Sequence, residues 1–329
     1  MTALASVRNA RPFRMKAGIS KLGDLVDGLT ALGTLMAAGG KWYYCDPTNG
    51  STAGDGLAPE TATSSLETAY ALTRDGYNDG VIFIGGATAF NPAASITWAK
   101  NYCHLIGISS NLPGLGQRCR VVGLAATGLS PVITFSGSGN VISNMQFNNE
   151  KAAGAASGVA IVTGLRNQFE NVFFMAPTAT DAASYSLKVS GSENAFVNCT
   201  IGQFTNPRTA ASYGLWLFGA STCLRNKFIG CEFLSWGYNA NHVHVYADVQ
   251  LAVVPWVVWF ENCLFQHNGT QLTQAIDDNC TAAGHQIVLR GRDSGVLNAA
   301  AVADTLTYIF ALDAASNVSG LLMIAVAES

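Results

Sequence analysis

The sequence predicts an all-β protein, a right-handed parallel β-helix (solenoid) with an N-terminal arm and a capping helix. The first observation is an eight-residue repeat found five times at intervals of 27 or 32 residues, which is a typical solenoid coil length. The second is the alternation of short Val, Ile, Phe and Tyr runs with turn-forming residues, among them 34 glycines. The third is a composition of 49% hydrophobic and 12% charged residues, which supplies one continuous core.

The five copies of the repeat align without gaps. Positions three and eight are apolar in every copy, and because they differ by an odd number, one straight strand would turn them to opposite faces. Position five is asparagine or glycine, which tolerate turn conformations, so we expect a bend there and a ladder of asparagines along the stack. The copies are NVISNMQF from Asn140, NQFENVFF from Asn167, NAFVNCTI from Asn194, NKFIGCEF from Asn226 and VWFENCLF from Val258.

Three cysteines, Cys199, Cys231 and Cys263, share position six of the repeat. This position faces inward with position eight, so the cysteines are expected to stack in successive coils at the strand spacing of about 4.8 Å. A disulfide needs Cβ atoms about 3.8 Å apart. We therefore expect reduced core thiols in place of disulfides, metal ligands or catalytic groups.

Residues 1–40 combine a basic arm with an amphipathic helix. The basic residues precede the first acidic residue, Asp24, and the apolar residues between 20 and 38 follow helical spacing until Gly39-Gly40 ends the run. The arm is either a solvated tail or a segment laid on an acidic partner, and the helix either caps the solenoid or docks on a neighbouring subunit. The residues expected to bind a partner are Arg8, Arg11, Arg14, Lys16, Leu25 and Leu29.

The rest of the chain divides into residues 41–283, the parallel β-helix, and residues 284–329, where strands continue without the repeat. We expect this last part to be a cap or an oligomerisation element.

In the 32-residue coils, residues 234–242 and 266–280 are expected to bulge outward as loops. The low surface charge and the apolar C-terminal end favour a homotrimer.

The segment that follows residue 41 combines an aromatic strand, WYYC, with Asn- and Gly-rich turns and a second helical patch that contains Ala69 and Tyr70. It resembles the first segment of pectate-lyase-like parallel β-helix proteins, and the whole repeat resembles the β-helices of phage virion proteins such as spikes and decoration proteins. The resemblance implies the fold and carries no activity. The matching residues are Asp46-Pro47, Asn49-Gly50, Asp55-Gly56, Pro59 and Leu66.

A polysaccharide-cleaving β-helix needs two carboxylates within reach of one bond. Glu170 and Glu261 occupy the same outward repeat position three coils apart, a rise of about 14 Å that is too large for an acid and its partner. Glu232 and Glu261 lie in adjacent coils, about 10 Å apart, which is marginal even for an inverting pair. We therefore expect no catalytic residue on this repeat.

No metal ion or cofactor is expected either. His242 and His244 alternate along a strand and so share a face, which suits two metal ligands. No nearby Cys, Asp or Glu has the spacing that would place it on the same face as a further ligand. The loop with Asp46, Asn49 and Asp55 lacks the regular spacing of a calcium-binding loop. We interpret it as a turn, and the segment LRGRDSG as a charged turn.

Three functions remain open. The first is a non-catalytic virion structural protein, a capsid decoration (cement) or tail-associated β-helix, attached to the major capsid or tail protein through the N-terminal arm. The second is a polysaccharide-cleaving enzyme of the tailspike or lyase type. The third is an adhesin that binds surface glycans through exposed aromatic rings, for which the candidates are Trp216, Trp236, Trp256, Trp259 and Tyr238.

The charge and hydropathy patterns exclude two classes of partner. The net charge is −3 and no basic stretch follows residue 21, which argues against binding of free nucleic acid. No apolar run reaches the roughly 20 residues of a membrane span, and the N-terminus does not fit a signal peptide. We expect synthesis in the host cytoplasm and a final location in the virion.

Overall fold

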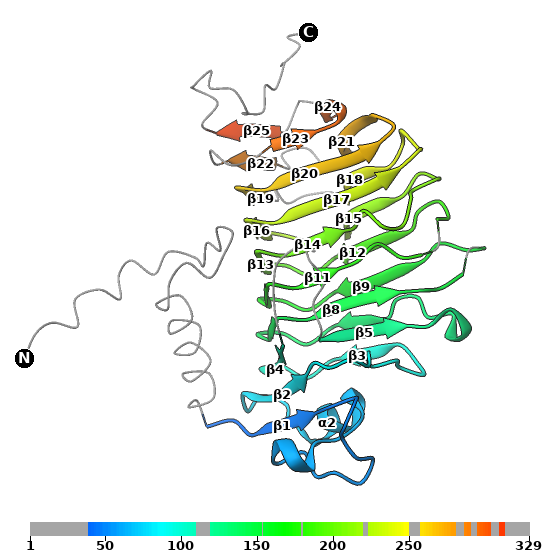
Figure 1. Ribbon diagram of the computed structural model, residues 1–329. Coiled ribbons are helices and arrows are strands. Elements are labelled where there is room, and N and C mark those ends of the chain that lie inside the picture. Colours follow the sequence, from blue (N-terminus) through cyan, green and yellow to red (C-terminus); the bar gives the residue numbers. More distant parts are fainter. Residues whose placement is uncertain are drawn as a thin grey trace, which may run out of the picture.

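The computed structural model describes residues 39–109, 119–152, 154–178, 180–219, 223–249, 257–280, 286–290, 295–303 and 309–312. Their strands wind into a stack of coils with one parallel sheet along each of three sides (Figure 1). Each strand pairs with the equivalent strand of the coils before and after it. The predicted parallel β-helix is confirmed.

The three sheets, here called A, B and C, contain 10, 7 and 8 strands. Sheet A consists of β1 (Trp42–Cys45), β2 (Asp79–Ile84), β4 (Cys103–Ile108), β7 (Val141–Ser143), β10 (Gln168–Glu170), β13 (Ala195–Val197), β16 (Lys227–Ile229), β19 (Val257–Glu261), β22 (Gln286–Arg290) and β25 (Ile309–Leu312). Sheet B consists of β5 (Arg120–Gly123), β8 (Gln146–Asn149), β11 (Phe173–Phe174), β14 (Thr200–Gly202), β17 (Glu232–Gly237), β20 (Leu264–Gly269) and β23 (Gly295–Leu297). Sheet C consists of β3 (Ile96–Trp98), β6 (Ile133–Phe135), β9 (Gly158–Val162), β12 (Tyr185–Val189), β15 (Tyr213–Gly219), β18 (Val243–Val249), β21 (Leu272–Asp278) and β24 (Ala299–Ala303).

The register of sheets A and B reproduces the eight-residue repeat. At position three, Phe169 pairs with Phe196 and Phe196 with Phe228, and their rings stack with centroids 4.8 and 4.6 Å apart. At position eight, Phe233 pairs with Phe265 at 4.6 Å. These rings are buried and form the centre of one continuous core.

A left-handed residue bends the chain between sheets A and B in every copy of the repeat. Position five has φ between 51° and 62°, and its backbone amide donates to a carbonyl of the next coil, as Asn262 does to Arg290. In addition, Asn171 Nδ2 donates to Asn144 Oδ1 at 2.9 Å. Asparagine and glycine are the residues that adopt this conformation at least cost, so the predicted bend is confirmed. The five residues are Asn144, Asn171, Asn198, Gly230 and Asn262.

A second asparagine ladder, at position one of the repeat, was not predicted. Asn167 Oδ1 accepts from the Asn140 amide and Asn194 Oδ1 from the Asn167 amide, both at 2.9 Å, and Asn226 continues the series. All four side chains are at most 1% exposed. Each asparagine thereby satisfies a buried backbone N–H of the preceding coil, which would otherwise be unpaired.

The eight cysteines are free thiols, and seven of them are buried. Cys199, Cys231 and Cys263 line the core one above another, as predicted. Burial raises the pKa of Cys199 and of Cys263 well above the ordinary value of a thiol. Cys199 and Cys263 are therefore protonated packing groups at neutral pH.

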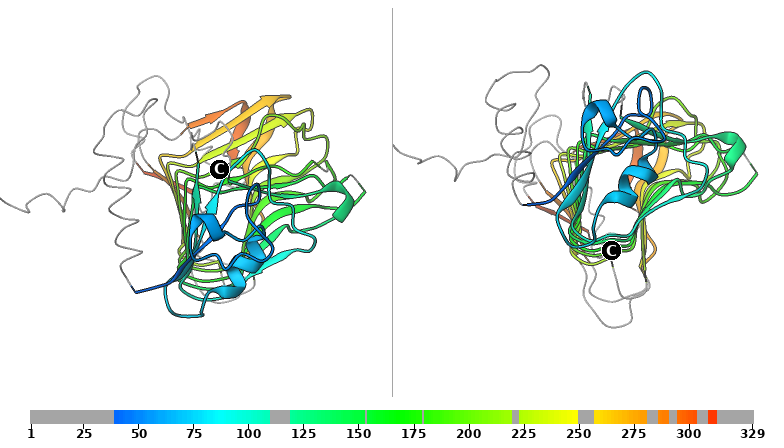
Figure 2. Two further views of the ribbon diagram at one scale, coloured as in Figure 1. Left: turned by 60° about the horizontal axis from the view of Figure 1, so that its bottom comes forward. Right: turned by 90° about the horizontal axis from the view of Figure 1, so that it is seen from below.

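Helix α2 (Leu66–Leu72) covers the first coil. It lies across the section of the solenoid when the molecule is seen from below (Figure 2), and Leu66 and Ala69 are fully buried in the core. Tyr70 stacks on Trp98 with centroids 4.1 Å apart. The second helical patch of the sequence is thus a cap, whereas the amphipathic helix expected at 20–38, with the rest of the basic arm, lies outside the described residues.

The prediction of an outward loop at 266–280 was wrong, because β20 and β21 take up most of these residues. At 234–242 strand β17 takes up the first four residues, and residues 238–242 form a turn before β18. The longer coils lengthen the strands, and β17 pairs with β20 over six residues. Beyond residue 283, β22 and β25 extend sheet A, β23 extends sheet B and β24 extends sheet C.

In the part of the chain that the structure describes, no helix has the length and apolar character needed to cross a bilayer.

Candidate functional site

The glutamates named from the sequence are divided between sheets A and B. Val197 and Ile229 separate Glu170 from Glu261 in the register of sheet A, so these two glutamates lie three coils apart as expected. Glu261 forms an ion pair with Arg290 at 2.6 Å. Burial raises the pKa of Glu232, which lies on a different sheet.

His242, His244 and His267 are buried. His242 and His244 are 2% and 1% exposed, with ring centroids 5.8 Å apart. His267 joins them, because its ring stacks on that of His242 with centroids 6.3 Å apart. Ser212 pairs with His242 Nδ1 at 3.0 Å and Ser235 with His267 Nδ1 at 2.8 Å. Among the described residues, no group of three or more His, Cys, Asp or Glu has the arrangement of a metal site.

The Asp46 loop is a turn. Asp46 Oδ1 accepts from the amides of Thr48 and Asn49, and Oδ2 accepts from Asn49 Nδ2. Asp55 accepts from the Leu57 amide and from Thr61 Oγ1. These carboxylates stabilise the local backbone in the manner of Asx turns.

The outer surface of sheet C gathers aromatic and charged side chains from four coils. Leu187, Leu215, Val245 and Ile276 are paired in register and fully buried, so the residue that follows each of them points outward. The outward residues, together with neighbours from the same strands, define the sheet C face: Lys188, Tyr213, Trp216, Phe218, Tyr246, Asp248 and Asp277.

The side chains of the sheet C face contact one another across the coils. Lys188 Nζ lies 3.7 Å from the ring centroids of both Trp216 and Phe218. Tyr213 stacks on Tyr246 with centroids 4.3 Å apart, and Trp216 meets Tyr213 edge-on at 5.5 Å. Phe218 is 38% exposed. The face is therefore a preformed aromatic surface that remains partly open to solvent.

The electrostatics of the sheet C face keep its hydroxyl groups protonated. Burial, followed by the charges of neighbouring groups that include Asp248 and Asp277, raises the pKa of both Tyr213 and Tyr246. Burial lowers the pKa of Lys188, and Asp248 partly offsets this effect. At neutral pH the face thus offers phenol donors beside carboxylate acceptors.

Asp248 and Asp277 form a carboxylate pair that the sequence interpretation missed. Tyr246 pairs with Asp277 in the register of sheet C, and Asp248 follows Tyr246 by two residues. Asp248 is thus one strand away from Asp277 across the sheet and two residues farther along the strand direction, which places the two Cα atoms roughly 8 Å apart. Aligning HVHVYADV with LTQAIDD in sheet C, in the way that the repeat of sheets A and B was aligned, would have revealed the pair.

The aromatic residues named from the sequence are divided among the faces. Among the candidates that the structure describes, only Trp216 belongs to the sheet C face. Trp236 lies on sheet B, where Tyr238 contacts it edge-on at 6.2 Å. Trp259 lies on sheet A, and Trp256 is outside the described residues, as are the six residues expected to bind a partner.

No family model and no curated protein match this sequence. Solved structures do match. Pectin methylesterase PemA from Erwinia chrysanthemi has 14% identity over 82% of this chain and 80% of its own length, with a TM-score of 0.52. A rhamnogalacturonan lyase has 14% identity over 80% of this chain and 75% of its own, with a TM-score of 0.51. The likeness establishes a pectate-lyase-like parallel β-helix fold.

Proposed function

We propose that this chain is a non-catalytic structural β-helix of a virus particle whose sheet C face binds a glycan. The observation that supports the binding role is the contact of five side chains from three coils, in which Lys188 and the rings of Trp216, Phe218, Tyr213 and Tyr246 form one surface. The virion location rests on the resemblance of the repeat to phage β-helices.

Sugars suit such a surface because they present apolar C–H faces and a rim of hydroxyl groups. Aromatic rings bind the apolar faces, and the phenol, ammonium and carboxylate groups of the sheet C face supply hydrogen bonds that orient the ligand. Equivalent outward side chains recur about every 4.8 Å along the stack, so an extended glycan is contacted by several coils.

A glycan array probed with the full chain tests the binding role. Phe218→Ala and Tyr246→Ala should each weaken binding to the array's positive glycans about tenfold, since a lost aromatic contact of this kind contributes about 1.4 kcal/mol. Tyr238→Ala is the matched control, because Tyr238 is 67% exposed and lies outside the sheet C face. Equal losses in all three variants, or none in the first two, would reject the assignment.

A second candidate function is glycan cleavage by Asp248 and Asp277. Their Cα atoms lie roughly 8 Å apart, so rotation of the side chains can place the carboxyl groups at the distance of an inverting pair, about 6.5 to 9.5 Å. Release of reducing ends from glycans that bind the chain is the measurement. Cleavage that is lost in Asp248→Asn and Asp277→Asn with binding retained would support an enzyme and reject the non-catalytic proposal.

The virion location has its own test. Mass spectrometry of particles purified from the producing host should detect peptides of this chain at a fixed ratio to the major capsid or tail protein. Deletion of residues 1–38 should then remove the chain from the particles while the purified variant stays folded. Particles that lack the full-length chain would contradict this location, whatever the outcome of the glycan experiment.

A further inference from the structure

A second surface feature lies on sheet A, on a different side of the solenoid from the sheet C face. It is a shallow hollow of about 410 Å³ over the successive strands β13, β16 and β19. The hollow exists because alanine interrupts a column of larger outward side chains, as Gln168, Ala195, Lys227 and Trp259 follow one another in register. The hollow is lined by Glu193, Asn194, Ala195, Arg225, Lys227 and Trp259.

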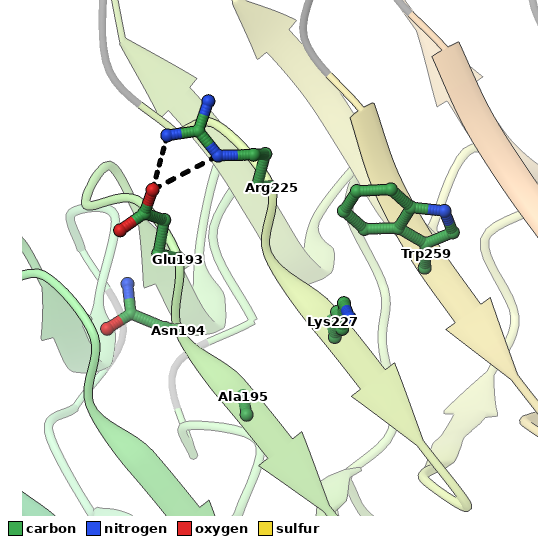
Figure 3. Close-up of a pocket in the computed structure, with 6 residues that line it drawn as sticks. All are labelled: Glu193, Asn194, Ala195, Arg225, Lys227 and Trp259. Carbon is green, nitrogen blue, oxygen red and sulfur yellow. Dashed lines mark hydrogen bonds and ion pairs between the residues drawn. The ribbon is translucent and has the colours of Figure 1, made fainter.

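The lining has a polar end and an aromatic end (Figure 3). At the polar end Arg225 donates from Nε and Nη2 to one oxygen of Glu193. At the aromatic end lies the indole ring of Trp259, and Lys227 stands between the two ends with Nζ 5.3 Å from the ring centroid. The floor, Ala195, is apolar and admits a ligand close to the sheet.

Positive charge prevails around the hollow. Glu193 is the one carboxylate among the residues that line it, and it already pairs with Arg225 and with Arg166, which comes from the preceding coil. These hydrogen bonds, that to Arg225 first, hold the pKa of Glu193 below its ordinary value. Two arginines therefore pair with one ionised carboxylate, and Lys227 adds a third positive charge, directed at the indole ring of Trp259.

We propose that this hollow binds a sugar residue that carries a carboxylate or sulfate group. The apolar face of the sugar packs on Trp259, and the anionic group lies between Lys227 and Arg225. Arginine and lysine donate charge-assisted hydrogen bonds to such groups, while the ring selects ligands with a flat apolar face. A neutral sugar or a free inorganic anion satisfies one half of the site only. This site is independent of the sheet C face.

Isothermal titration of the full chain at low salt tests the proposal with three probes. These are a hyaluronan tetrasaccharide, which carries glucuronate, the neutral tetramer of N-acetylglucosamine, and inorganic sulfate. The hyaluronan tetrasaccharide is expected to bind at least tenfold more tightly than either of the others. Raising the salt to 150 mM should weaken its binding, since exposed charges are screened.

Variants assign the binding to the hollow. Lys227→Gln combined with Arg225→Gln should abolish the preference for the charged tetrasaccharide, and Trp259→Ala should weaken its binding about tenfold. Lys151→Gln removes a positive charge outside the hollow and is the matched control, and Tyr246→Ala reports on the sheet C face. Thermal melts verify that each variant is folded.

Three results would overturn the proposal. One is equal affinity for the charged and neutral tetramers. Another is binding of inorganic sulfate as tight as that of the tetrasaccharide, which would mean a simple anion site. The third is loss of hyaluronan binding in Tyr246→Ala with full retention in the Lys227 and Arg225 double variant, which would place all glycan binding on sheet C. The sheet C proposal survives the first two results.

Discussion

At the scale of single residues, polar side chains inside this solenoid connect coils that are 27 to 37 residues apart in sequence. Asn194 is an example: its Oδ1 accepts from the Asn167 amide, and its Nδ2 donates to Gly164 O at 3.1 Å and to Asn226 Oδ1 at 3.2 Å. Burial removes water as an alternative partner. Each of these polar groups therefore depends on a residue of an adjacent coil for its hydrogen bond.

Replacing Asn194 with alanine should lower the free energy of unfolding by about 1–3 kcal/mol, because the Asn167 amide is left buried without an acceptor. Urea unfolding followed by circular dichroism measures the change. Gln168→Ala, at an exposed position of the adjacent strand, is the control and should stay within about 0.5 kcal/mol of the parent. A loss as small as that of the control would show that the ladder does not stabilise the fold.

The buried histidines make stability dependent on pH. Burial lowers the pKa of His244 to about 3, with a smaller contribution from His267, and lowers that of His242, where His244, Arg208 and His267 add repulsion. A lowered folded pKa means that the unfolded chain takes up the proton first as the pH falls. The stability that neutral His244 provides is therefore complete above pH 6.5 and declines between pH 6.5 and about 3.

Between these limits His244 alone should reduce the free energy of unfolding by about 1.4 kcal/mol per pH unit. Denaturation curves at pH 7.5, 5.5 and 4.5 measure the slope. His244→Leu removes the titrating group but fills the same site, so its stability should fall less steeply than that of the parent. Parallel slopes for parent and variant would contradict this assignment.

At the scale of elements, the corner between sheets A and B allows few residue types. Asn262 has φ of 53°, where side chains branched at Cβ are strained. Asn262→Val should destabilise the chain by about 1–2 kcal/mol, whereas Asn262→Gly should cost less than half of that because glycine adopts this conformation freely. Thermal melts of the two variants test the difference, and equal losses would mean that side-chain contacts, not φ, determine the residue at this corner.

Helix α2 closes the open end of the core at the first coil. Ser65 accepts from the Thr68 amide with its side-chain oxygen and so caps the helix. The helix covers the open end of the core with Leu66 and Ala69. An uncovered terminal coil would expose apolar side chains and leave strand edges available for pairing.

At the scale of the whole molecule, one core runs through every described coil from Tyr43 to Leu289. In a solenoid each coil contacts only its neighbours, so a defect in one coil of the rod perturbs mainly the adjacent coils. Such a rod suits the proposed role of a rigid structural protein that carries binding faces on its sides.

The low charge of the surface predicts association of these rods into a homotrimer. Size-exclusion chromatography with light scattering should give about three times the chain mass of 34.5 kDa. Dilution to micromolar concentration should leave the trimer intact, since structural oligomers bury large interfaces. A monodisperse species with the mass of one chain would contradict the prediction.

The sequence by itself determined the coil, because its signals are local and repeat. The apolar pair Phe169 and Phe174, the asparagine corner between them and the inward cysteines define one coil, and the repeat then predicts the stack. Only the tertiary structure decided which side chains meet on the outer faces and in the interior. Lys188, Trp216 and Tyr246 follow one another in successive coils because coils of unequal length bring sheet C into register, and the eight-residue repeat of sheets A and B does not encode that register.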